Sequence, residues 1–340
     1  MKIGVLLSGG LDSSTAAFLL KKQGHEVIAI TMRNGKYDPL AAAEESAGEI
    51  GLAHHIIDLS ELFQDRVINY FCQTYARGET PNPCVVCNRY IKFGALLDYA
   101  KSLGCEKIAT GHYANITYDP STSRYQLRKG ADPKKDQSYF LYDLSQEQLS
   151  YTIFPLGALT KEEVKTIARE QNIKALNNRE SQEICFISDD YRDLLKEEIV
   201  LRPGAIVDLS GNRLGTHQGV AWYTVGQRKG LRVSWSHPLY VTDLDPENNL
   251  VIVGKETDLY KKVLWSAYNN FVSVAKFEEP LLVKAKIRYR ANEAPAWIYP
   301  EGNLARVEFI EPQRAITKGQ AIVYYDGDIV VGGGRIHSCG

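Results

Sequence analysis

The chain has 340 residues, of which 44% are hydrophobic and 24% are charged, and its formal net charge is −1 at pH 7. This length suffices for two or three domains, and the near-zero charge excludes a general attraction of the whole molecule to nucleic acid. Its six cysteines are too sparse for a disulfide scaffold, no apolar run reaches the length of a membrane span, and the chain opens on a strand without a signal peptide. We therefore expect a cytoplasmic protein without a membrane partner.

A strand, a glycine turn and a helix come first. The apolar run 2–7 predicts a buried strand, and the pattern over 15–23, ended by Gly24, predicts a helix. Glycines let the backbone approach a phosphate, and free N–H groups at a helix N-terminus favour negative charge. Ser13 is expected to cap that helix. The sequence therefore predicts an anion site, with a plain glycine turn as the alternative, and its residues are Leu6, Leu7, Ser8, Gly9, Gly10, Leu11, Asp12 and Ser13.

This turn matches neither of two common phosphate-binding motifs. No lysine follows the glycines as in GxxxxGK[ST], and the spacing is not GxGxxG. The SGGxDS pattern instead resembles the PP-loop of ATP pyrophosphatases. Those enzymes cleave ATP between the α and β phosphates and adenylate a carbonyl oxygen.

Strands alternate with helices up to about residue 110. Further strands are expected at 26–32, 54–58 and 107–110, and helices at 39–50, 59–77 and 90–103. Two prolines exclude 80–88 from helix, so we expect Cys87 in a fixed loop. The alternation predicts a doubly wound parallel sheet, whose ligands bind beyond the carboxyl ends of the strands. Met32 ends one such strand and Gly111 follows another, so both join the predicted nucleotide site.

The pattern changes near residue 200. Before it we expect a hairpin at 115–118 and 125–129, a helix at 161–171, a strand at 181–187 and a helix at 191–198. After it, short apolar alternations such as 219–224 are separated by Gly, Asn, Asp and Pro, which predicts two all-β modules, expected to be small barrels. We therefore divide the chain into a PP-loop domain (1–200), a central β-rich domain (201–262) and a C-terminal β-barrel domain (263–340).

Further motifs make the resemblance specific, because together with SGGLDSS they resemble the tRNA-specific 2-thiouridylases over essentially the whole chain. They lie at 80–88, 111–114, 135–141, 181–186, 224–231, 288–290 and 319–320. The resemblance implies 2-thiolation of the wobble uridine of tRNA through adenylation of the uracil C2 oxygen, with release of AMP and pyrophosphate. It implies ATP and Mg²⁺, and it implies tRNA and a sulfur-donor protein as partners. Asp12 is a residue that could hold the Mg²⁺ against the phosphates.

The same resemblance assigns roles to particular residues. It implies Cys87 as the nucleophile and Cys185 as the persulfide carrier, because a second thiol must release the sulfur or attack the activated carbon. Considered without its neighbours, Cys185 reads equally well as a small buried hydrophobe. A target uridine flipped out of its stack is expected. The implied tRNA contacts are His112, Lys135, Asp136, Gln137, Arg288, Tyr289 and Gln320.

Cys84 departs from the commonest pattern of the family, which has an aspartate at this position. Cys84, Cys87 and Cys185 could hold a 4Fe–4S cluster whose fourth iron is open to a sulfide. In the competing interpretation Cys87 and Cys185 remain the persulfide pair, and Cys84 is a spectator or a third thiol that resolves disulfides. Zinc fits less well, since no fourth cysteine lies nearby in the sequence.

Two other functions stay open at this point. Another PP-loop ligase or amidotransferase would need neither the C-terminal β modules nor the paired cysteines. A non-catalytic RNA-binding module would need no intact loop at 8–13 and no Cys87 and Cys185.

Overall fold

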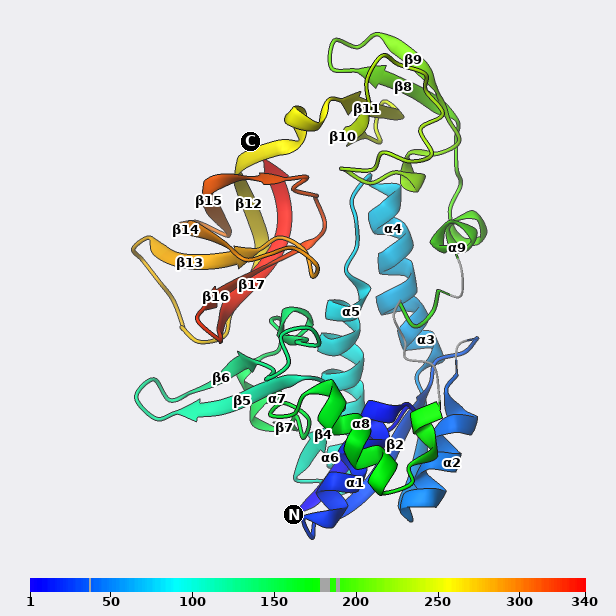
Figure 1. Ribbon diagram of the computed structural model, residues 1–340, viewed down its shortest axis with the longest axis vertical. Helices are drawn as coiled ribbons and strands as arrows, with labels where there is room; N and C mark the ends of the chain where they lie inside the picture. The colour runs from blue at the N-terminus through cyan, green and yellow to red at the C-terminus, as the bar shows by residue number, and fades with distance from the viewer. Residues whose placement is uncertain (37, 178–183, 188–189) are drawn as a thin grey trace.

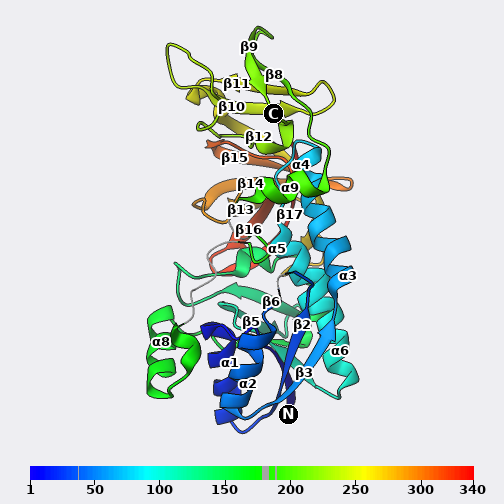
Figure 2. The ribbon, with the colours of Figure 1, turned by 90° about the vertical axis from the view of Figure 1, so that its right-hand side faces the viewer.

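The structure is a computed structural model, and it describes residues 1–36, 38–177, 184–187 and 190–340. The described parts are strung along one long axis (Figure 1). An α/β domain lies at one end, a small β-sheet at the other, and a β-barrel lies to one side between them (Figures 1 and 2). The N-terminus lies in the α/β domain and the C-terminus in the barrel.

The α/β domain is built on a parallel sheet with strand order β3-β2-β1-β4-β7. Alternate residues of its strands pack on opposite faces: Val5 and Val27 contact the layer of α1 and α2, whereas Ile28 packs against the helices of residues 60–102. The predicted doubly wound sheet is thus confirmed. The strands are β1 (Lys2–Leu6), β2 (Glu26–Arg33), β3 (Ala53–Asp58), β4 (Lys107–Ala109) and β7 (Thr152–Ile153).

The chain order of this sheet creates a switch point at β1. From β1 the chain moves outward to β2 and β3, then returns to β4 on the other side of β1. At such a point the loops after neighbouring strands diverge and leave a crevice for a ligand. The loops that follow β1 and β4 therefore border one site.

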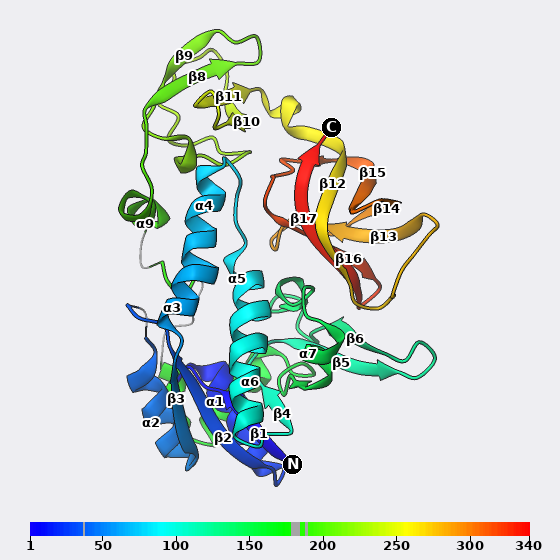
Figure 3. The same cartoon turned by 180° about the vertical axis from the view of Figure 1, so that it is seen from behind.

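Two long helical runs connect the domains. The first consists of α3 (Ser60–Phe63), a π-helical segment (Gln64–Asn69) and α4 (Tyr70–Ala76), and it reaches from the α/β domain toward the small sheet (Figure 3). The second consists of α5 (Pro83–Val86), a π-helical segment (Cys87–Ala95) and α6 (Leu96–Ser102).

The second run corrects the expected loop at 80–88. Pro83 stands at the first helical position, where its missing N–H is not needed, so the helix begins there instead of near residue 90. Cys84 and Cys87 consequently lie one turn apart on a helix. The first run agrees with the expected helix at 59–77.

The other helices cover or connect the sheets. Helix α9 coincides with the expected helix at 191–198, but residues 184–187 form a turn, so that part of the strand expected at 181–187 is wrong. Residues 181–183 lie outside the described residues. The remaining α-helices are α1 (Leu11–Lys22), α2 (Leu40–Ile50), α7 (Gln146–Ser150), α8 (Lys161–Glu170) and α9 (Tyr191–Glu198). Short 3-10 turns occupy Ser138–Phe140, Lys174–Asn177, Val220–Trp222 and Glu256–Leu259.

The small sheet has strand order β10-β11-β8-β9. The strand expected at 219–224 is wrong, because the 3-10 turn lies there, and β9 was not expected because polar residues and Gly215 interrupt its apolar pattern. Its strands are β8 (Gly204–Asp208), β9 (Arg213–His217), β10 (Tyr240–Asp245) and β11 (Leu250–Gly254).

Six strands form the barrel, which closes by pairing β12 with β17. The hairpin β5–β6 of the α/β domain extends this sheet, with Arg128 opposite Ile329. The barrel is therefore joined to the α/β domain by main-chain pairing. The strands of this sheet are β5 (Ala114–Asp119), β6 (Arg124–Lys129), β12 (Tyr260–Phe271), β13 (Leu281–Lys286), β14 (Ala294–Glu301), β15 (Leu304–Arg314), β16 (Ala321–Asp326) and β17 (Ile329–Cys339).

Within the described residues, no helix is both long and apolar enough to cross a membrane.

Candidate active site

The glycine turn after β1 has the backbone of an anion site. Gly9 has a φ of +70°, and a Cβ there would lie 2.2 Å from the carbonyl carbon of Ala42, so another residue does not fit. Gly10 caps α1, which corrects the expected Ser13 cap. The Ser13 hydroxyl instead lies inside the turn, donating to the Gly10 carbonyl at 3.1 Å and accepting the Ser8 N–H at 3.2 Å. The first turn of α1 thus faces this loop with its free N–H groups.

Asp12 is held from two sides in the first turn of α1. Its Oδ1 accepts the hydroxyl of Tyr113 at 2.8 Å and the ammonium of Lys161 at 2.7 Å. Lys161 is the first residue of α8 and only 4% exposed. From the sequence, Tyr113 was noted only within the motif at 111–114 and Lys161 only as the start of an expected helix. Neither was assigned to the nucleotide site, because their partner lies more than a hundred positions away.

Gly111 and Met32 lie beside the same loop. A Cβ on Gly111 would be 2.7 Å from the carbonyl carbon of Asp12, so only glycine lets the segment after β4 approach α1. Met32 is partly buried near the end of β2, next to Thr31, whose hydroxyl donates to the Leu7 carbonyl at 2.7 Å. The structure therefore brings together the predicted nucleotide contacts from the loops after β1 and β4 and from the end of β2.

The three candidate thiols differ in exposure. Cys87 is buried, Cys84 is half-buried and Cys185 is exposed, and all three are free. Burial raises the pKa of Cys87 to about 12 and that of Cys84 to about 11. Although Cys185 is the most exposed, desolvation by the surrounding protein also raises its pKa. Cys185 in turn raises the pKa of the other two, so the three thiols lie within electrostatic reach of one another.

Lys92 is the cation of this cluster and was not identified from the sequence. Its charge lowers the pKa of Cys84, Cys87 and Cys185, opposing the effect of burial. Lys92 follows Cys87 by five positions, a spacing that shares a face in the π-helical segment but not in an ordinary α-helix. A search for thiol partners at α-helical spacing therefore passes over it.

His112 lies next to this cluster, buried between two aromatic rings. Its ring centre is 6.0 Å from those of Phe93 and Phe154, and its Nδ1 is 2.7 Å from the Thr110 hydroxyl. Burial, and then the charge of Lys92, hold the pKa of His112 well below its ordinary value. His112 is therefore neutral at pH 7.

The thiols do not form a ready metal site. Across the described residues, no three His, Cys, Asp or Glu side chains are arranged so that they could hold a metal ion. Cys84, Cys87 and Cys185 are all described, so the three-thiolate set that a 4Fe–4S cluster needs is not preformed.

Several expected tRNA contacts are engaged within the protein. Asp136 is buried and accepts the N–H groups of Gly130 and Ser138 at 3.0 and 3.1 Å. Gln137 accepts the Tyr113 N–H at 3.0 Å. Lys135 is half-buried in the same turn, where its N–H donates to the Asp132 carbonyl. These residues fix the segment before the Ser138–Phe140 turn.

The expected contacts from the barrel lie on the seam with the α/β domain. Gln320 donates to the carbonyl of Pro81 at 3.0 Å, and Arg288 donates to the carbonyl of Arg314 at 2.7 Å. Tyr289 packs with its ring centre 4.5 Å from that of Phe140. Gln320 thus joins β16 to the segment that leads into Cys84.

Fold and site together define a nucleotide-binding α/β protein of the PP-loop class with a cysteine cluster beside the loop. Three family models match in succession: "tRNA methyl transferase HUP domain" over residues 1–189, "tRNA methyl transferase PRC-barrel domain" over 192–255 and "Aminomethyltransferase beta-barrel domain" over 261–336. The tRNA-specific 2-thiouridylase MnmA 1 of Caldanaerobacter subterraneus subsp. tengcongensis is 50% identical, covering 98% of this chain and 97% of that protein. The MnmA of Syntrophomonas wolfei subsp. wolfei is 47% identical, covering 99% and 100%. The chain therefore belongs to the tRNA-specific 2-thiouridylase family.

A solved 4-thiouridine synthetase–RNA complex with bound ATP is 18% identical, with a TM-score of 0.36 over 54% of this chain and 44% of that one.

Proposed function

We propose that this chain replaces the C2 oxygen of a wobble uridine in tRNA by sulfur, at the cost of one ATP. One observation carries the proposal: the ring of His112 lies 6.0 Å from that of Phe93, on the helical segment that carries Cys87, while Gly111, next to His112, packs on Asp12. The cysteine cluster and the phosphate-binding loop therefore border one site. A uridine bound in that site would lie near both the ATP that adenylates it and the cysteines that transfer sulfur to it.

One difficulty determines the order of the chemical steps. A carbonyl oxygen is a poor leaving group, so the uracil O2 first attacks the α-phosphate of ATP and pyrophosphate leaves. The terminal sulfur of a Cys185 persulfide then attacks C2, and the C–O bond breaks to release AMP. Finally Cys87 attacks Cys185 Sγ, the persulfide S–S bond breaks, and 2-thiouridine and a Cys87–Cys185 disulfide result. An external dithiol must reduce that disulfide before the next turnover.

The loop residues have separate tasks in this proposal. The N–H groups between Ser8 and Ser13 hold the phosphates, and Asp12 would hold Mg²⁺, which supplies charge neutralisation at the phosphates. Among the described residues, Tyr113 and Lys161 both donate to Oδ1 of Asp12. Lys161 therefore orients the carboxylate from the side of the protein.

The remaining assignments rest on the family and on charge. We assign tRNA contacts to the exposed parts of the seam around Lys135, Arg288 and Tyr289. A neutral His112 suits a place beside the target base, because it can donate or accept a hydrogen bond without carrying charge. Residues 1–200 supply the chemistry, and 201–262 and 263–340 hold the tRNA. A tRNA substrate also favours a cytoplasmic location.

Two alternatives predict either iron and sulfide in the purified protein or a different reaction product. Use of a 4Fe–4S cluster would require Cys84, Cys87 and Cys185 to rearrange, and anaerobically purified protein would contain iron and sulfide. Methyl transfer, which the names of two of the matching family models mention, needs no persulfide and no ATP cleavage between the α and β phosphates.

The test incubates the protein with ATP, Mg²⁺, unmodified tRNA and glutathione persulfide, followed by mass analysis of the nucleosides. We expect 2-thiouridine together with equal AMP and pyrophosphate, and loss of all three products without tRNA. A methylated nucleoside, or ATP turnover without tRNA, would contradict the proposal.

A further inference from the structure

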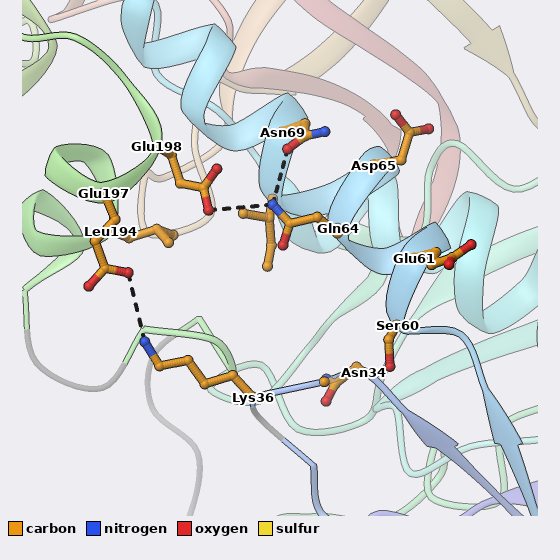
Figure 4. A pocket seen from close by; sticks show the side chains of 12 residues that line it. Asn34, Lys36, Ser60, Glu61, Gln64, Asp65, Asn69, Leu194, Glu197 and Glu198 are labelled. Carbon is orange, nitrogen blue, oxygen red and sulfur yellow. Dashed lines mark hydrogen bonds and ion pairs between the residues drawn. The ribbon is translucent and has the colours of Figure 1, made fainter.

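The helical run over residues 60–76 has one side that does not suit RNA. A cavity of about 510 Å³ lies there, between this run, the turn after β2 and α9 (Figure 4). Carboxylates outnumber the one ammonium among the residues that line it, and carboxylates repel phosphates. The carboxylates belong to Glu61, Asp65, Glu197 and Glu198, and the ammonium to Lys36. The part of the run that meets the barrel has a different character.

The barrel presents a tyrosine on a bulge of β12. The pairing of β12 with β17 shifts its register between Ala267 and Asn270. Tyr268, inside this bulge, has a φ of +53° and is 78% exposed. A left-handed backbone is unfavourable for a bulky residue, and burial of the ring does not compensate for it here. Strained positions of this kind concentrate at functional sites, and bulges often direct a side chain toward one.

Neighbouring residues hold this bulge in place. The Asn269 side chain donates to the Ser266 carbonyl at 3.0 Å and accepts the Ser266 hydroxyl at 2.7 Å. On β17, a Cβ at Gly334 would lie 2.2 Å from Oδ1 of Asn269, so only glycine lets the strand pass. The position of Tyr268 is therefore specified by the barrel.

Arg335 of β17 lies over two tyrosine rings. Its guanidinium carbon is 5.2 Å from the ring centre of Tyr268 and 4.9 Å from that of Tyr70, which begins α4. Among the described residues, no carboxylate forms an ion pair with Arg335 and no acceptor takes a hydrogen bond from its guanidinium. Arg306 also lies over a tyrosine, but its guanidinium pairs with two carboxylates, those of Glu301 and Glu308. The N–H groups of Arg335 therefore remain available to an anion.

These residues adjoin the seam to which tRNA contacts are assigned above. The Tyr70 hydroxyl accepts the N–H of Asn82 at 3.4 Å. Asn82 precedes Cys84 by two positions, a span of at most about 7 Å. In the pairing of β16 with β17, Arg335 lies opposite the first residue of β16, which directly follows Gln320. The tyrosine and arginine cluster thus continues the tRNA seam next to the thiol-bearing helix.

We propose that Tyr268 and Arg335 bind an unpaired nucleotide of the anticodon loop, outside the pocket that takes the target uridine. The Tyr268 ring stacks on the base, and the Arg335 guanidinium donates to a phosphate. A loop nucleotide fits better than a stem nucleotide, because a base can stack on a side chain only where it is not already stacked in a helix. The inference rests on the proposed function and adds two positioning residues to it.

Tyr268→Gly separates a binding role from a structural one. Glycine removes the ring and also relieves the left-handed strain, so the melting temperature should not fall. The Kd for unmodified tRNA, measured by filter binding at fixed salt without ATP, should rise about tenfold. Tyr268→Trp keeps a stacking ring and should bind tRNA as the wild type does. In the thiolation assay Tyr268→Gly should raise the KM for tRNA and leave kcat unchanged.

Arg335→Gln tests the phosphate contact. It should weaken tRNA binding and reduce the slope of log Kd against log salt concentration by about one. Tyr118→Ala is the matched control, because Tyr118 is also an exposed tyrosine, at 53%, but among the described residues no cation lies over its ring. Its Kd for tRNA should equal that of the wild type.

A series of tRNAs, each with one abasic residue in the anticodon loop, locates the base. At the position that stacks on Tyr268, the wild type and Tyr268→Gly should bind the abasic tRNA equally. A difference that persists at every position would overturn the inference.

Three further results would overturn it. The first is equal tRNA affinity of Tyr268→Gly and a wild type that forms 2-thiouridine. The second is weaker binding together with a lower melting temperature, in Tyr268→Gly and Tyr268→Trp alike, which would indicate a structural role. The third is an unchanged Kd for tRNA with a raised KM for a protein persulfide donor, which would assign the cluster to that protein. If Tyr268→Gly binds tRNA weakly but the wild type forms no 2-thiouridine, the proposed function fails and the nucleotide contact stands.

Discussion

The ammonium group of Lys161 lies 2.7 Å from Oδ1 of Asp12, although the two residues are 149 positions apart. Lys161 is almost fully buried, whereas the side chain of Asp12 is 35% exposed. The pair therefore ties α8 to the first turn of α1 and fixes the carboxylate at the edge of the glycine turn after β1. The glycine turn has no lysine of its own, unlike the GxxxxGK[ST] motif. Lys161 approaches it from a distant helix, and its ammonium contacts Asp12.

Asp12→Asn should lower the rate of thiolation about a hundredfold or more while tRNA affinity stays unchanged, because the loop loses the charge that orients Mg²⁺. It should also lower the free energy of unfolding by roughly 1–3 kcal/mol, since the ion pair between Asp12 and Lys161 loses one of its two charges. The double variant Asp12→Asn/Lys161→Met should not regain activity. Recovery of thiolation in the double variant would show that Asp12 only maintains structure.

Lys92→Gln should slow alkylation of the thiols by iodoacetamide, because the loss of its charge raises the pKa of all three further. Lys92→Arg keeps the charge and should react at nearly the wild-type rate. Since the pKa of Cys87 is about 12, the wild-type rate at Cys87 should still be rising at pH 9, with Cys185 modified first. Equal rates for Lys92→Gln and wild type, measured by peptide mass mapping, would exclude the coupling.

His112 should contribute to acid lability. Its folded-state pKa is lowered, so the unfolded chain binds the extra proton, and stability is lost as the pH falls through the unfolded value of about 6.5. His112→Gln removes this term, and its free energy of unfolding should fall less between pH 7 and pH 5 than that of the wild type. The Asp143 carboxyl, whose pKa burial raises to about 6, acts in the opposite direction but is common to both proteins. Parallel pH profiles would contradict the assignment.

Gly319→Ala changes a residue of the barrel, but we expect it to reduce activity by displacing a segment of the active site. Gly319 has a φ of +86°, and a Cβ there would lie 2.9 Å from the Thr80 carbonyl oxygen. The substitution should therefore displace the segment that Gln320 holds, lower the melting temperature and reduce kcat more than the ATP affinity. Gly327→Ala is a suitable control, because it also has a positive φ but has open space around it. Equal kcat values in the two variants would refute the link.

The sequence was most informative where local pattern decides structure. Apolar runs between helices were enough for the parallel sheet, and the SGGxDS pattern was enough for a glycine turn at the N-terminus of a helix. It failed at Pro83, because a proline that breaks the interior of a helix is favourable at its first position. At Val220–Trp222 the apolar residues bury themselves through a 3-10 turn, which alternation alone does not distinguish from a strand.

The parts of the site that were not foreseen depend on long-range packing. Lys161 and Tyr113 matter only because the fold brings α8 and the segment after β4 to Asp12. Asp136, Gln137 and Gln320 were expected to contact tRNA, but each is hydrogen-bonded within the protein. The partners of Asp136 and Gln137 lie in the α/β domain, and the partner of Gln320 lies across the seam with the barrel. The exposure of Cys185 likewise could not be read from its apolar neighbours, which suggested burial.

The most direct test of the account loads Cys185 with one radiolabelled persulfide sulfur, removes free sulfur, and adds ATP, Mg²⁺ and unmodified tRNA in a single turnover. We predict that labelled 2-thiouridine, AMP and a Cys87–Cys185 disulfide form in equal amounts, and that Cys87→Ser stops the release of the labelled nucleoside. Label that stays on Cys185 while 2-thiouridine forms from another source, or labelled product without ATP cleavage, would contradict the account.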